Sequence, residues 1–200
     1  SRKGSSGKIK EKPVAYTEDN DVKIFNPSEK KDDSNDIISF VEGMAHHRQN
    51  GNVDKAKELG VEMALAIYDE DQTAKLSDEI FLSPEVFPQL CALMLFSTEA
   101  AFNYYLPSPQ LSAIAINAFH EVMSRNNLPI YEQVMSGPAF SFYFLNVRKG
   151  GEHIAEDIGK AFAMLCGHKD EEKFINEGIT RYTETLKEIQ QKIIDMKFEN

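Results

Sequence analysis

Apolar residues from Ser34 onward recur at intervals of three and four positions, which is the spacing of an amphipathic α-helix. The first such stripe consists of Ile37, Phe40, Val41 and Met44. We expect this helix to end at Asn50-Gly51, a pair that readily adopts the left-handed conformation. A second helix is predicted from Asn52, whose side chain suits an N-cap. Its expected buried stripe is Ala56, Leu59, Met63, Ala66 and Ile67.

Two later helices are predicted from the same start sequence, a serine followed by a proline. Ser83-Pro84-Glu85 predicts a helix that runs to about Tyr105, and Ser108-Pro109 predicts the next one. The first of these helices is apolar nearly all round, which is typical of a helix enclosed by others. We therefore expect it at the centre of the fold.

The stretch that follows is less regular. Residues 138–147 have the composition of a buried strand, but their surroundings are helical. We predict helix, interrupted at Gly137-Pro138, because proline cannot continue the hydrogen-bonded ladder. A further helix is expected over residues 152–166.

The last predicted helix, residues 170–198, has apolar residues at alternating intervals of four and three. They are Ile175, Ile179, Tyr182, Leu186, Ile189, Ile193 and Met196. This spacing is typical of a helix that lies along others at a shallow angle. We interpret it as a long closing helix of the same domain, because a single short stripe is marginal as an independent coiled coil. The alternative is a homodimer formed through this helix.

Together these patterns predict an all-α fold of antiparallel helical hairpins, packed as an array or bundle. Residues 34–200 are predicted to form a single all-α domain. Residues 1–33 are rich in lysine, serine, glycine and acidic side chains and have no sustained period, so we interpret them as a charged flexible arm or linker.

The composition narrows the classes of partner. A net charge of −10 argues against a broad nucleic-acid surface, which needs a net basic face. The longest apolar stretch is too interrupted to span a bilayer. Cys91 and Cys166 lie in apolar runs, as reduced, buried cysteines do. We expect a cytoplasmic protein without a cofactor.

Glu42 and His46 are four residues apart, so they share a helix face and could present two ligands to one metal ion. Further ligands would have to come from elsewhere, and the candidates are His120-Glu121, Glu99, and His153 with Glu156 and Asp157. The HExxH sequence and the paired ExxH of di-iron bundles are absent. A metal site of Glu42 and His46 with His120 or His153 is therefore an alternative, not the main hypothesis.

Aromatic residues are dense in the middle of the chain, and not all of them can face inward. The surplus would line a groove for a peptide or an apolar ligand. Arg148, beside Lys149 at a predicted helix end, could hold an anion, although cations there also complement the helix dipole. The binding residues predicted on these grounds are His46, Tyr104, Tyr105, Tyr131, Tyr143 and Arg148.

The segment from Phe40 to Tyr68 resembles a tetratricopeptide unit, two antiparallel helices in a 34-residue repeat. Phe40 stands where that family has a large aromatic residue, Gly51 is at the turn, and Ala56 is at the small crossing position. The departures are Met44, His47, Gly60 and Tyr68. The unit does not recur at the family's spacing. The resemblance implies a tetratricopeptide-like helical array, and such arrays are usually binding modules.

The function hypothesis is therefore a non-enzymatic module that binds a protein or peptide. The first alternative is the helical metal-binding protein or metal-dependent enzyme described above. The second is a scaffold that self-associates through the helix over residues 170–198.

Overall fold

The computed structural model describes residues 33–67, 75–126 and 129–200. Across these residues the chain forms α-helices and one short 3-10 helix and no strand, which confirms the predicted all-α class. Of the predicted arm, residues 1–33, all but Asp33 lies outside the described residues. No helix in the described part is long and apolar enough to cross a membrane.

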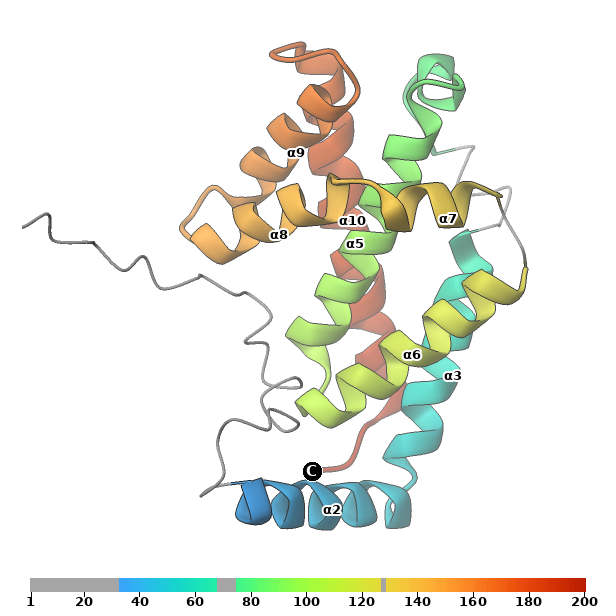
Figure 1. The fold of residues 1–200 in the computed structure, drawn as a ribbon, viewed down its shortest axis with the longest axis vertical. Helices are drawn as coiled ribbons and strands as arrows, with labels where there is room; N and C mark the ends of the chain where they lie inside the picture. The colour runs from blue at the N-terminus through green and yellow to red at the C-terminus, as the bar shows by residue number, and fades with distance from the viewer. Residues whose placement is uncertain (1–32, 68–74, 127–128) are drawn as a thin grey trace, which may run out of the picture.

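Helix α5 (Phe87–Tyr105) lies at the centre of the fold, as its all-round apolar character predicts. It packs against α10, α7, α8, α6 and α9 (Figure 1). The helix begins at Phe87 and not at the predicted Ser83-Pro84-Glu85, where the chain forms a turn. In this turn the Ser83 carbonyl accepts hydrogen bonds from the N–H groups of Val86 and Phe87. A 3-10 helix, η2 (Glu79–Leu82), precedes that turn and inserts Phe81 beside Phe174, with ring centroids 5.2 Å apart.

The closing helix α10 (Glu172–Met196) packs along α9 (Ile154–Leu165) and α5 of the same chain. The contact with α9 is close because it is built on glycines: a Cβ at Gly159 would lie 2.5 Å from the Ile175 carbonyl oxygen. On the predicted stripe, Tyr182, Ile189 and Ile193 are buried within this body. Helix α10 is therefore a closing helix of its own domain, as predicted. A homodimer formed through this helix stays a prediction.

Helices α3 (Asn52–Ile67) and α6 (Pro109–Arg125) form a second close pair. A Cβ at Gly60 would lie 2.3 Å from the Ala115 carbonyl oxygen, so a side chain there would force the two helices apart. The predicted start of α6 is confirmed, because Ser108 Oγ accepts from the Leu111 N–H at 3.3 Å.

The ambiguous stretch is helical, as predicted, and breaks at Gly137-Pro138. It forms α7 (Pro129–Ser136) and α8 (Ala139–Lys149), which follow one another across the face of α5 (Figure 1). Helix α8 ends at Gly150, whose φ of 67° lies in the region that favours glycine.

The first predicted helix is confirmed, but half of its apolar stripe is exposed. Helix α2 (Asp33–Gln49) exposes Ile37 by 45% and Val41 by 58%. It leaves the body at one end of the molecule, and α3 makes its main contacts with α6 instead (Figure 1). The antiparallel pairing of α2 with α3 that a tetratricopeptide unit requires is therefore not confirmed.

Candidate functional site

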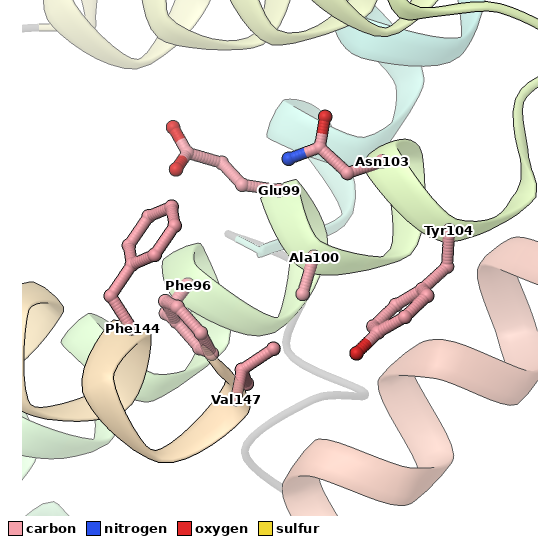
Figure 2. Close-up of a pocket in the computed structure, with 7 residues that line it drawn as sticks. All are labelled: Phe96, Glu99, Ala100, Asn103, Tyr104, Phe144 and Val147. Carbon is pink, nitrogen blue, oxygen red and sulfur yellow. The ribbon is translucent and has the colours of Figure 1, made fainter. Parts of the chain in front are cut away.

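A pocket of about 210 Å³ lies between α5 and α8 (Figure 2). Residues at intervals of three and four along α5 form one wall, and residues three apart on α8 form the other. Ala100 leaves room between these walls because its side chain is small. The pocket is lined by Phe96, Glu99, Ala100, Asn103, Tyr104, Phe144 and Val147.

Glu99 is the one charged residue among those that line this pocket, and its side chain is only 16% exposed. His120 Nε2 of α6 contacts Glu99 Oε1, and His120 Nδ1 lies 2.7 Å from the Tyr131 hydroxyl of α7. In the neutral imidazole, Tyr131 donates to Nδ1 and Nε2–H donates to Glu99, so one tautomer satisfies both contacts. The network fixes the position of the carboxylate and connects α5, α6 and α7.

The other polar groups at the pocket are an amide and a phenol. Asn103 Oδ1 accepts a hydrogen bond from Ser112 Oγ at 2.8 Å, and its nitrogen points toward the side of Glu99 (Figure 2). Burial raises the pKa of Tyr104, although a hydrogen bond with Tyr182 acts in the opposite direction. Burial also raises the pKa of Tyr131, and the charge of Glu99 adds to this effect. Both phenols are therefore protonated, and so uncharged, at neutral pH.

The predicted binding residues do not converge on one surface. Tyr104 lines the pocket and Tyr131 contacts His120 in the Glu99 network, while Tyr105, the last residue of α5, is half-buried and does not line the pocket. Tyr143 is fully buried beside Phe96, and its pKa is raised well above the usual value by that burial. A contact with a partner, as predicted for Tyr143, requires an exposure that this residue lacks.

Arg148 is exposed in the last turn of α8, where it complements the helix dipole. It does not line the pocket. The anion-binding role therefore finds no further support in the geometry.

The His46-His47 pair lies at the elbow between α2 and α3, where it helps to hold the end of the chain. His47 Nδ1 lies 2.9 Å from Asn52 Nδ2, and His47 Nε2 lies 3.3 Å from Ser108 Oγ. Exposed His46 lies 3.2 Å from the backbone oxygen of Asn200. Because these contacts are internal, the histidine pair is explained by the fold.

The Asn52 side chain does not cap α3 as predicted, since it is fully buried against the C-terminal segment. Its Nδ2 donates to the Glu199 carbonyl at 2.7 Å, and its Oδ1 accepts from the Glu199 N–H at 2.9 Å. Asn50 Oδ1 accepts from the Asn52 N–H at 3.1 Å in its place. Lys55 adds a contact to the Lys197 carbonyl at 2.7 Å.

The alternative metal ligands Glu42, His46 and His120 are not brought together. Among the described residues, no three histidine, cysteine or acidic side chains are grouped so that they could hold a metal ion. His153 instead pairs with Glu156 at 3.5 Å on the exposed face of α9.

Two further groups of reactive or charged residues belong to the core. Cys91 and Cys166 are free and buried, as predicted, and burial raises the pKa of each thiol to about 12. Neither is a nucleophile at neutral pH, because the thiolate is the reactive form.

The buried Glu177 and Arg181 pair within α10, and Ser77 donates to Glu177 at 2.8 Å. This pair anchors the segment before η2.

The sequence does not predict this pocket, and it indicates Glu99 only as a candidate metal ligand. One feature of the sequence could have indicated it: Glu99 is the one charged residue in α5, which is mostly apolar. Its partners His120 and Tyr131 come from two other helices, so their meeting depends on tertiary packing.

Comparison with protein-family models, with curated protein sequences and with solved structures gives no match to this chain.

Proposed function

We propose that this protein is a non-enzymatic binding module that holds a peptide segment of a partner protein across α5 and α8. One side chain of that segment would enter the Glu99 pocket. The observation that supports this proposal is the pocket itself, in which aromatic and aliphatic walls surround a single, mostly buried carboxylate. Apolar concave sites with few, well-placed polar groups are typical of ligand recognition.

The size of the pocket favours one side chain over a whole cofactor. Sites for drug-sized molecules and cofactors usually enclose about 300 to 1,000 Å³. The Glu99 pocket, at about 210 Å³, is smaller. A side chain from a longer peptide fits this volume, while the rest of the peptide would lie on the surface.

The state of His120 favours binding over acid–base catalysis. A general base needs a ring nitrogen within reach of the substrate proton. Both nitrogens of His120 are occupied, one by Glu99 and the other by Tyr131. The imidazole therefore supports the carboxylate and offers no free nitrogen to a ligand.

The test is selection of a displayed random-peptide library on the full chain, followed by fluorescence polarisation with the enriched synthetic peptides. Val147→Trp fills the pocket, because Val147 lines it. Leu145→Trp is the matched control on the same helix, at a side chain 56% exposed and outside the pocket.

We expect Val147→Trp to weaken binding at least about tenfold, which corresponds to about 1.4 kcal/mol, and Leu145→Trp to change it by less than about twofold. Circular dichroism checks that both variants fold. Enriched peptides that bind Val147→Trp as tightly as the unmodified chain would contradict the proposal.

A further inference from the structure

We propose that the Glu99 pocket selects a lysine side chain, so that the bound segment is a basic peptide. This inference rests on the proposed function and names the chemistry of the group that enters the pocket. Three features support it: the open side of the carboxylate, the apolar walls around it and the charge of the whole chain.

Glu99 has one carboxylate oxygen available to a ligand. His120 occupies Oε1, whereas Oε2 has no hydrogen-bond partner within the described part of the chain. A carboxylate in a mostly buried position is costly unless it is paired. An ammonium group bound at Oε2 would supply that pairing and would form a charge-assisted hydrogen bond.

The walls of the pocket suit the methylene stem of a lysine. Phe96, Ala100 and Val147 form an apolar lining beside the carboxylate, and the Phe144 ring lies next to Glu99 (Figure 2). Lysine buries its alkyl stem along such surfaces while its charged end seeks a polar partner. Aromatic rings add a favourable electrostatic interaction with a cation.

The same geometry disfavours the other classes of side chain. A neutral apolar group would remove water from the Glu99 carboxylate without replacing its hydrogen bond. An anionic group would be repelled by Glu99 and by a chain of net charge −10. Arginine is best bound by both oxygens of a carboxylate, and here His120 already occupies one of them.

The experiment uses small probes that isolate the side chain. The probes are N-acetyl-lysine methylamide, N-acetyl-norleucine methylamide, which has a similar stem without the ammonium, and N-acetyl-arginine methylamide. Each is titrated into the full chain while the methyl signals of Ala100 and Val147 are followed by NMR. Glu99→Gln removes the charge but keeps an oxygen for His120. Glu132→Gln, at an exposed residue of α7 that does not line the pocket, is the control for net charge.

We expect the lysine probe to bind with a dissociation constant of about 1 mM, as ordinary ligand efficiency gives for a molecule of this size. The norleucine probe and the Glu99→Gln variant should each bind at least about tenfold more weakly, and Glu132→Gln should bind within about twofold of the unmodified chain. If Glu99→Gln fails to fold, the comparison of probes on the unmodified chain decides alone.

Norleucine or arginine binding as tightly as lysine would overturn the inference. The proposed function would survive that result, provided that Val147→Trp still weakens binding of the selected peptides at least about tenfold. Absence of any shift at Ala100 and Val147 with all three probes would also overturn the inference. If the selected peptides were in addition indifferent to Val147→Trp, the proposed function would fail with it.

Discussion

The elbow between α2 and α3 and the Glu99 pocket both place a histidine beside an amide or a carboxylate, but they differ in what completes the arrangement. At the elbow, Asn52 is fully buried and bonds to His47 and to both backbone groups of Glu199. In the pocket, Glu99 bonds to His120 on one side and faces a cavity on the other. Polar groups that the chain itself satisfies stabilise the fold, whereas a polar group with one open side is suited to a ligand.

The largest effect on stability should come from Asn52→Ala. This change removes the hydrogen bonds that hold the C-terminal segment against the elbow and leaves space in a buried site. We expect the free energy of unfolding to fall by about 2 kcal/mol, measured by urea denaturation. Asn146→Ala is the control, because among the described residues Asn146 donates to the Phe142 carbonyl of its own helix and to no other group. Equal, small losses for the two variants would show that the Asn52 hydrogen bonds do not stabilise the fold.

Acid should weaken the elbow through His47, by less than Asn52→Ala does. Burial lowers the pKa of His47 below its usual 6.5, and the charge of His46 lowers it further. The folded chain therefore binds this proton less readily than the unfolded chain does. The stability due to neutral His47 is complete above about pH 6.5 and is lost as the pH falls through the lowered folded pKa.

The hydrogen bonds also predict that protonation of His47 lowers the stability of the fold. A proton on His47 Nδ1 would face the side-chain Nδ2–H of Asn52. Urea denaturation between about pH 7.5 and pH 5 should show a steeper loss for the unmodified chain than for His47→Ala, while the other histidines contribute alike to both. Parallel losses in the two proteins would contradict this role of His47.

The smallest effect on stability should come from Glu99→Gln, at the residue that we propose binds the lysine side chain. Glutamine keeps an acceptor for His120, and the position retains some contact with water. We expect the free energy of unfolding to change by less than about 0.5 kcal/mol in the same urea experiment. A loss as large as that of Asn52→Ala would place Glu99 among the structural groups and remove the contrast between the two regions.

The sequence predicts features that depend on local chemistry. The Ser108 cap, the break at Gly137-Pro138 and the central position of α5 all follow from neighbouring residues or from the apolar pattern of a single helix. The helical state of residues 139–147 follows in the same way from its surroundings.

The errors concern contacts between distant parts of the chain. The apolar stripe of α2 predicts a helix, but whether another helix covers that stripe depends on the tertiary arrangement. The sequence predicts Asn52 as a helix cap, but its side chain instead bonds to Glu199, which is 147 positions away. The sequence predicts that His46 binds a ligand or a metal ion, but it and His47 make contacts within the fold. Glu99 and His120 come from separate helices, so the sequence does not show that they meet.

The site of peptide contact provides the most direct test of the contrast between the two regions. Amide chemical shifts of the full chain should be recorded with and without a peptide selected from the library. We expect the shifts to concentrate in the segments 96–104 of α5 and 144–147 of α8, which carry the residues that line the pocket, with little change in residues 46–55 and 197–200. Shifts concentrated at the elbow and the C-terminal segment, with the pocket unaffected, would contradict the assignment of the Glu99 pocket as the binding site.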